Sequence, residues 1–139
     1  LARLAYVRPD GAPTVVPVGF LWDGNAVVVC TATTAPKADA IRRHPRVAVE
    51  IEGGHGAEQL LLIRGDAVVD VVDGVAEEYL AASRKDLRGD DAEEFATRVR
   101  QMYPQMARIA ITPRWVRYYD FPGGRLPPFL RALADDAGF

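Results

Sequence analysis

The first part of the sequence is a series of short apolar runs separated by turn signals, and this pattern constrains the fold more than any other feature. The runs at residues 2–7 and 14–22 are followed by the pairs Asp10-Gly11 and Asp23-Gly24, and a third run covers residues 26–31. Glycine accepts the positive φ that tight hairpin turns require. The pattern therefore predicts consecutive β-hairpins.

Two prolines distinguish the second of these runs. Pro13 lies at its start and Pro17 lies inside it. Because proline has no backbone N–H, it cannot donate a hydrogen bond to a strand ladder. We therefore expect the run 14–22 to be an edge strand, to be bulged, or to face something other than a neighbouring strand.

The rest of the chain contains both strands and helices. Gly65 lies inside a long β run, where glycine indicates a bulge or a barrel corner, and Thr112-Pro113 separates the last two runs. Strands are predicted at residues 47–52, 58–72, 109–111 and 115–121. Helices are predicted at residues 37–43, 73–87, 91–103 and 129–134.

These elements fit one domain over residues 1–139, with a helical insert at about 73–103. Many short strands, then helices, then a return to strand are typical of a small β-barrel with helices on its outside.

Composition excludes several classes of protein. The net charge of −2 gives no positive field for nucleic acid or an anionic membrane. No apolar run reaches the ~18 residues of a membrane span. The single cysteine, Cys30, excludes a disulfide within the chain, fits the reducing cytoplasm, and is expected in the core. We therefore expect a cytoplasmic protein whose partners include neither nucleic acid nor membrane.

The usual catalytic constellations are missing from the sequence. No histidine or cysteine spacing resembles a metal site, and no glycine-rich loop of the Walker type is present. No catalytic residue is assigned and no metal is expected. If the protein is an enzyme, a cofactor would carry the difficult chemical step.

The segment from Thr31 to Lys37 is the most informative. Thr33 and Thr34 offer hydroxyls before a helix, Thr34 is a plausible N-cap, and Pro36 suits the first turn. Lys37 then lies where the helix dipole disfavours a cation, which an anion bound to the free N–H groups would correct. This arrangement predicts a phosphate site, with Lys37 exposed in the absence of a ligand. The alternative is a lysine that simply points into water.

Two strands could contribute to the same site. Pro17 leaves one donor out of the run 14–19, so a flat ring could rest against its free backbone groups; the alternative is a bulged barrel strand. Alternation places Trp115, Arg117 and Tyr119 on one face, where arginine could stack on an aromatic ring or bind an acid. The alternative for this face is an aromatic core or dimer surface with Arg117 at its rim.

Taken together, these features resemble the pyridoxamine 5′-phosphate oxidase-like family of FMN- and deazaflavin-binding proteins. The order and spacing of the matching pieces carry the resemblance over most of the chain. The pieces are residues 2–11, 16–18, Asp23-Gly24, Thr31, Lys37, residues 41–47 and residues 63–67.

The resemblance implies a fold that is mainly β with flanking helices (α+β), a six-stranded antiparallel split β-barrel. It also implies a homodimer with the cofactor in a groove between the two chains. The resemblance implies that the cofactor phosphate is held by Thr31, Thr33, Thr34 and Lys37. It implies that the ring is held by the backbone of Val16, Pro17 and Val18. Further contacts to the cofactor are implied from Trp115 and Arg117 of the second chain. The chain departs from the family pattern at Ala35, Pro36 and Ala40, where the family often has a basic residue before the lysine and commonly an Asn after it.

The implied function is that of an oxidoreductase that uses FMN, or alternatively the deazaflavin coenzyme F-420, to transfer hydride to or from a small organic substrate. A second hypothesis is a protein that holds a flavin or another planar ligand without turnover. An oligonucleotide-binding barrel would need a basic groove with aromatic platforms, and the acidic balance argues against it.

Overall fold

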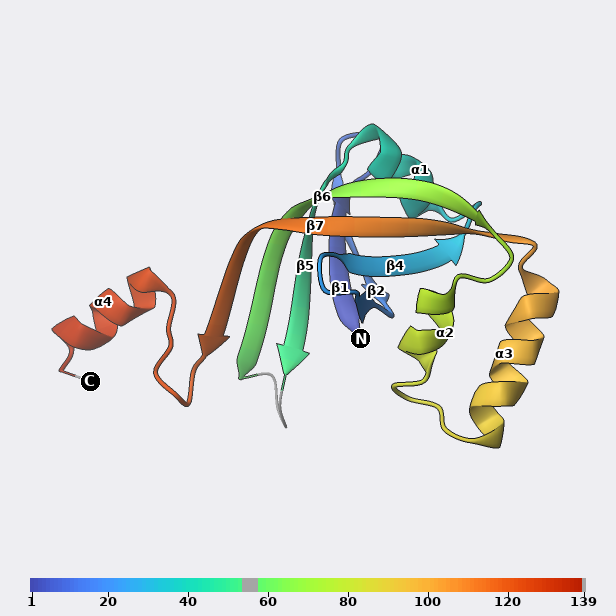
Figure 1. Cartoon of the computed structure of the whole chain (residues 1–139). Coiled ribbons are helices and arrows are strands. Elements are labelled where there is room, and N and C mark those ends of the chain that lie inside the picture. Colours follow the sequence, from blue (N-terminus) through green and yellow to red (C-terminus); the bar gives the residue numbers. More distant parts are fainter. Residues whose placement is uncertain (54–57, 139) are drawn as a thin grey trace.

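The computed structural model describes residues 1–53 and 58–138, which form one antiparallel sheet with helices around it (Figure 1). The elements in chain order are β1 (Ala2–Val7), β2 (Pro13–Val18), β3 (Leu21–Trp22), β4 (Val27–Ala32), α1 (Pro36–Arg43), β5 (Arg46–Gly53), β6 (Gln59–Asp73), α2 (Glu77–Ser83), α3 (Asp90–Met102), β7 (Gln105–Asp120) and α4 (Pro128–Asp136).

The seven strands of the described sheet lie in the order β2-β1-β5-β6-β7-β4-β3. The two edge strands, β2 and β3, follow one another in the chain and are joined only through Gly19 and Phe20. A two-residue connection between opposite edges requires the sheet to coil until its edges approach. The fold is therefore mainly β with helices outside, an open sheet consistent with a split barrel.

The six strands implied by the family resemblance are wrong, because the described sheet has seven. The strand bounds also differ from those predicted, because the run 14–22 is not one strand. It divides at Gly19 and Phe20 into β2, which pairs with β1, and β3, which pairs with β4. The runs 109–111 and 115–121 are, conversely, a single strand, β7. Thr112 and Pro113 do not interrupt it, because the partner strand changes register beside them.

Two expectations based on backbone chemistry are confirmed. β2 pairs only with β1, so Pro17 lies on an edge strand. The register of β6 against β7 shifts at Gly65: Arg64 pairs with Trp115 and Gly65 with Pro113, which leaves Arg114 as the extra residue of a bulge. Figure 1 shows that both long strands bend partway along their length, so one part of each belongs to the barrel and the other extends away from it.

The barrel encloses one core of aliphatic side chains. Leu4, Ile109 and Ile111 are fully buried within it, and Ile41 from α1 packs into the same cluster. Apolar burial of this kind is the main favourable term in folding. It fixes α1, and therefore the residues just before α1, against the end of the barrel.

The insert between β6 and β7 has a small core of its own, formed by Leu80, Ala96 and Val99. The helix predicted at residues 73–87 begins later than expected, at Glu77. The reason is that β6 continues to Asp73, where its partner β7 is still available for pairing. No helix among residues 1–53 and 58–138 is long and apolar enough to cross a membrane.

Polar contacts attach the insert to the barrel. The Arg108 guanidinium on β7 lies 2.7 Å from the Glu78 carboxylate on α2 and 3.6 Å from Asp23. Burial alone would raise the pKa of Glu78, but hydrogen bonds from its own backbone and from Arg108 lower it. Lys85 Nζ, beyond α2, donates to the Phe20 carbonyl in the link between β2 and β3. The insert therefore covers the outer face of β4 beside that link.

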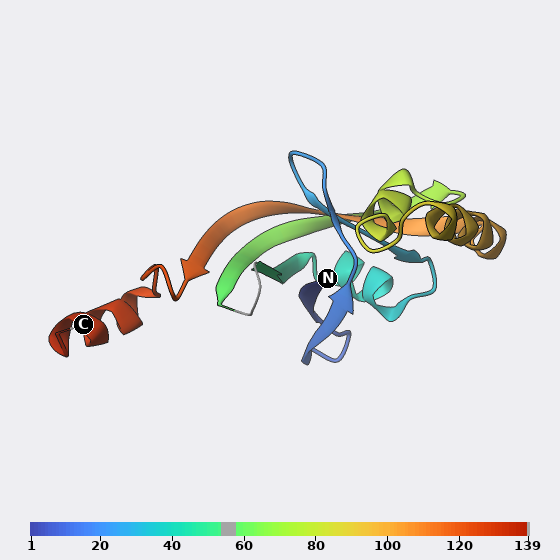
Figure 2. The same ribbon diagram turned by 90° about the horizontal axis from the view of Figure 1, so that it is seen from below.

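Helix α4 is found where the sequence predicts a terminal helix. It extends away from the barrel (Figure 2), and none of its residues is buried. Phe129 and Leu133 are each more than half exposed.

Candidate functional site

A short segment joins β4 to α1 and carries the predicted phosphate-binding hydroxyls. Thr31 is partly buried at the end of β4, and Thr33 and Thr34 are exposed in the following turn. The Ala35 N–H donates to the Ala32 carbonyl at 3.0 Å and closes this turn. The three threonines and Lys37 are therefore brought together at the N-terminal end of one helix.

The prediction that Thr34 caps this helix is wrong. Ala35 is the N-cap residue, and no side chain accepts a hydrogen bond from the first turn. The reason is Pro36 at the first helical position, because a residue before proline is driven out of the α region and Ala35 has ψ 133°. Pro36 has no N–H, and the Ala38 N–H donates to the Ala35 carbonyl at 3.0 Å. The Lys37 N–H is therefore the group of the first turn that no described side chain caps.

Lys37 is partly buried, not exposed as predicted. Burial lowers the pKa of its ammonium group, and no described carboxylate offsets that effect. A partly desolvated cation at the positive end of a helix dipole is unfavourable unless an anion lies beside it. The donor set of the Lys37 ammonium, the threonine hydroxyls and the Lys37 backbone N–H fits a phosphate.

The predicted ring-binding strand borders the split of the barrel. Val18 is buried and Val16 partly buried against the core, whereas Pro17 is exposed. Among residues 1–53 and 58–138, no strand pairs with the outer edge of β2. The short strand β3 pairs with β4 only at Val27 and Val28, so the rest of that edge of β4 has no described partner either. Since Gly19 and Phe20 connect β2 directly to β3, these two free edges flank the same split.

The two β7 residues predicted to contact the cofactor lie far along that strand from the threonines and Lys37. Trp115 and Arg117 share a face, as predicted, and the Arg117 guanidinium carbon lies 4.8 Å from the centre of the Trp115 ring. Thr31 pairs with Ala107, so Trp115 lies eight residues further along β7. At roughly 3.3 Å per residue, that is about 26 Å along the strand. One chain alone therefore does not bring Trp115 and Arg117 to the threonines and Lys37.

Comparisons with known proteins agree with the fold. The pyridoxamine 5′-phosphate oxidase family profile matches residues 1–120. The chain belongs to this family. No curated protein matches the chain.

Several solved structures are similar to this chain. An F420 reductase is 26% identical with a TM-score of 0.63, and the match covers 84% of this chain and 87% of that one. A conserved hypothetical protein from Mycobacterium tuberculosis is 25% identical with a TM-score of 0.62, covering 91% and 80%. An FMN-binding protein from Nostoc punctiforme shares the fold at 18% identity and a TM-score of 0.60, covering 89% and 75%.

The sequence interpretation missed Arg64. This residue pairs across the sheet with Trp115, and its guanidinium carbon lies 4.1 Å from the centre of the indole ring, so Trp115 has two arginines against it. The only signal in the sequence is that Arg64 interrupts an otherwise apolar stretch of β6. No group of three or more metal-binding side chains occurs in the part of the chain that the structure describes.

The expectation that Cys30 belongs to the barrel core is not met. Cys30 is partly buried and lines a cavity of about 200 Å³ between β4 and α2, together with Glu78 and Tyr79. It points outward because Val27 and Val29 fill the inner face of β4. Burial, and next the nearby Glu78 carboxylate, raises the pKa of the thiol to about 11.

We expect Cys30 to be unreactive toward iodoacetamide at pH 8, because the thiolate is the nucleophile and is scarce three pH units below the pKa of about 11. The alkylation rate should increase as pH rises through 9 and 10. Mass spectrometry of the intact protein follows the reaction, with free glutathione in the same tube as the reference. Alkylation as fast as that of glutathione at pH 8 would contradict the buried environment.

Proposed function

We propose that this protein binds a flavin or deazaflavin cofactor between two copies of the chain and transfers hydride between that cofactor and a small organic substrate. The observation that carries the proposal is Lys37, a partly buried cation without a described acidic partner at the uncapped start of α1. Thr31, Thr33 and Thr34 would add hydroxyls to the same phosphate.

The rest of the cofactor would lie along the split of the barrel. The free edge of β2 at Val16, Pro17 and Val18 offers backbone groups to a flat ring. When bound, the cofactor would supply the hydride chemistry, and the protein would supply position and a dry pocket. We propose FMN, with coenzyme F-420 as the alternative. The similar structures include both an F420 reductase and an FMN-binding protein, which supports testing both.

A homodimer is part of the proposal. The separation of about 26 Å along β7 between the Thr31 position and Trp115 means that both could meet one cofactor only if a second chain supplies Trp115 and Arg117. The splayed ends of β6 and β7 also leave large apolar side chains uncovered, among them Val116 and Tyr118. In the proposed dimer, the second chain would cover these side chains.

The test is a titration of the purified protein with FMN and, separately, with F-420, followed by absorbance and by quenching of cofactor fluorescence. We expect saturable binding of one of them with one cofactor per chain, and a dimer by sedimentation velocity at micromolar concentration. A protein that binds neither cofactor, or that is only monomeric, would contradict the proposal.

Cofactor binding without turnover is the second candidate. Residues 31–37 contain hydroxyls and one ammonium group but no carboxylate, imidazole or thiol that could act as an acid or base at neutral pH. Reduction of the bound cofactor, followed by addition of candidate electron acceptors in a stopped-flow instrument, distinguishes an oxidoreductase from a binding protein.

Arg117 gives a further prediction about the second chain. Arg117→Lys keeps the charge but loses the planar fork, so it should reduce turnover or substrate affinity more than cofactor affinity. Arg117→Met should reduce both. Cofactor titrations and the dimer dissociation constant are measured on both variants. If Arg117 is only at the rim of a dimer interface, the dissociation constant will change and the titrations will not.

A further inference from the structure

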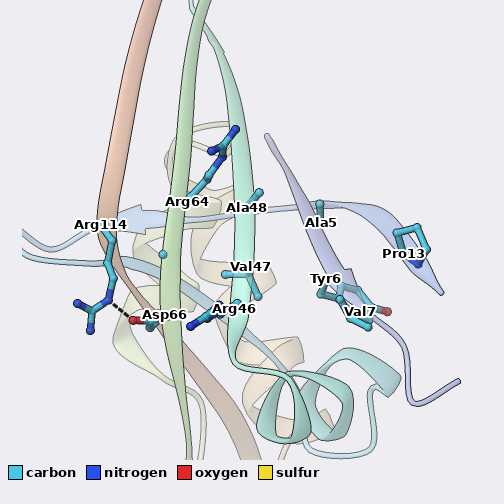
Figure 3. A pocket seen from close by; sticks show the side chains of 11 residues that line it. Ala5, Tyr6, Val7, Pro13, Arg46, Val47, Ala48, Arg64, Asp66 and Arg114 are labelled. Carbon is cyan, nitrogen blue, oxygen red and sulfur yellow. Dashed lines mark hydrogen bonds and ion pairs between the residues drawn. The ribbon is translucent and has the colours of Figure 1, made fainter. Parts of the chain in front are cut away.

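A groove of about 670 Å³ lies on the outer face of the sheet, away from the start of α1 (Figure 3). Its lining includes three arginines and one aspartate, a net charge of +2, on a chain whose net charge is −2. The cations are Arg46 from β5, Arg64 from β6 and Arg114 from β7. A local concentration of like charge on an acidic protein is unfavourable unless something neutralises it.

The chain neutralises only part of this charge. Arg114 forms an ion pair with Asp66, the one carboxylate in the lining. Arg46 is the cross-strand neighbour of Asp66, but it is exposed and forms no ion pair among the described residues. Figure 3 shows Arg46 and Arg114 on either side of Asp66, with Arg64 further along β6 and pointing away. At least one guanidinium is therefore available to an external anion.

The bulge in β7 is what places Arg114 here. Arg114 has no partner opposite on β6, because the register moves directly from the pair of Arg64 and Trp115 to the pair of Gly65 and Pro113. Bulges change the direction of a side chain and are frequent beside functional sites. The register puts Thr112 opposite Asp66 and Trp115 opposite Arg64, so the extra residue, Arg114, lies between them and its guanidinium reaches Asp66.

The remaining wall of the groove is mainly apolar. It is formed by residues of β1, β2 and β5, and the Tyr6 hydroxyl is its one polar side-chain group among the described residues. The lining residues are Ala5, Tyr6, Val7, Pro13, Val47 and Ala48. A pocket with apolar walls and a few convergent charged groups is typical of a small-molecule site. Guanidinium groups match the geometry of carboxylates and phosphates.

We propose that this groove binds a small organic anion, with a carboxylate or phosphate group held by Arg46 and Arg114 and an apolar body against the β1 wall. The site is separate from the proposed phosphate cradle. Lys37 lies at the beginning of α1 and Arg46 follows its end, and the eight residues of α1 span about 12 Å. The proposal therefore does not depend on cofactor binding.

The test uses phenyl phosphate as the probe, titrated at constant ionic strength into the ¹⁵N-labelled protein. Amide chemical shifts report binding residue by residue, so the groove and the cradle are read separately. We expect saturable shifts at Arg46, Asp66 and Arg114, and weaker binding of inorganic phosphate, which has no apolar body. Absence of shifts at these amides, or equal affinity for both probes, would overturn the proposal. Shifts at Thr33 and Lys37 alone would overturn it and leave the proposed function intact.

Two variants of opposite charge sharpen the test. Arg46→Gln should weaken binding in the groove about tenfold or more, as expected for loss of a charge-assisted hydrogen bond. Asp66→Asn should strengthen it, because the only competing carboxylate is removed. The matched controls are Arg98→Gln and Glu94→Gln, which change the charge identically in an exposed ion pair on α3. Lys37→Ala should leave groove binding unchanged. The proposal fails if Arg46→Gln binds as tightly as Arg98→Gln.

Discussion

Replacing Lys37 with alanine is expected to weaken FMN binding by about tenfold or more while leaving the melting temperature of the cofactor-free protein nearly unchanged. A charge-assisted contact to phosphate contributes roughly 1.5–3 kcal/mol. Lys37 has no described acidic partner in the free protein, so its loss breaks no ion pair within the chain. Fluorescence titration gives the affinity, and thermal unfolding monitored by circular dichroism gives the stability.

The matched control is Arg42→Ala, an exposed cation in the last turn of the same helix. It changes the net charge equally but lies at the other end of α1. The pH dependence adds a second readout. Because burial lowers the pKa of Lys37, its ammonium group loses its proton at a lower pH than that of an ordinary lysine. The FMN affinity of the wild-type protein should therefore begin to fall at that lower pH. Lys37→Ala should lack this fall. Equal affinity of the two alanine variants would remove Lys37 from the site.

The second large effect is expected from Gly65→Ala, which should destabilise the barrel by at least ~1–3 kcal/mol, the usual cost of forcing extra atoms into packed structure. A Cβ at this position would lie 2.4 Å from the Thr112 carbonyl oxygen and 3.0 Å from the Ile111 side chain. The first contact is with backbone, so no rotation of a side chain relieves it. The midpoint of thermal unfolding should fall by several degrees.

Gly53→Ala is the control for this variant. Gly53 also lies in a strand, but the nearest atoms to its added Cβ are in Gln59 at 3.9 Å, an ordinary contact. Denaturant unfolding of both variants separates the clash from the general effect of replacing glycine. If the two variants have the same unfolding midpoint, the close approach of β6 and β7 at the bulge is not as the structure describes it.

The sequence predicts most accurately those features that a single residue determines. Pro17 cannot donate to a ladder, so the edge position of its strand follows from local chemistry. Gly65 in a β run indicates a bulge for the same kind of reason. Pro36 at the start of α1 and the alternation of Trp115 with Arg117 are also local, and both are found as predicted.

The errors arise where a neighbour in space decides the outcome. Proline in Thr112-Pro113 suggests a break, but the bulge beside Gly65 keeps Pro113 within the strand. The end of β6 is set by its partner, so the strand extends to Asp73 and shortens the following helix. Thr34 is a suitable capping residue, yet Pro36 moves the cap to Ala35.

The candidate sites differ in the same way. The predicted phosphate cradle is continuous in sequence, so residue types and spacing are enough to propose it. The arginine-lined groove combines Arg46, Arg64 and Arg114 from three strands, and only the register of β5, β6 and β7 brings them to one face. The register of these three strands does not follow from any local pattern in the sequence.

The pairing of β6 with β7 has a consequence for how this fold can vary. Asp73 pairs with Gln105, and the Gly74 N–H donates to the Pro104 carbonyl at 2.8 Å, so the chain leaves the barrel and returns to it at one point. The entropy of closing a loop grows slowly with its length, by only about 0.6 kcal/mol for each doubling. The segment between these residues can therefore lengthen, shorten or be exchanged while the barrel register stays the same. A change of insert at this junction has a small entropic cost, and a different insert would give the same barrel a different neighbouring surface in place of the contacts that Glu78 and Lys85 now make.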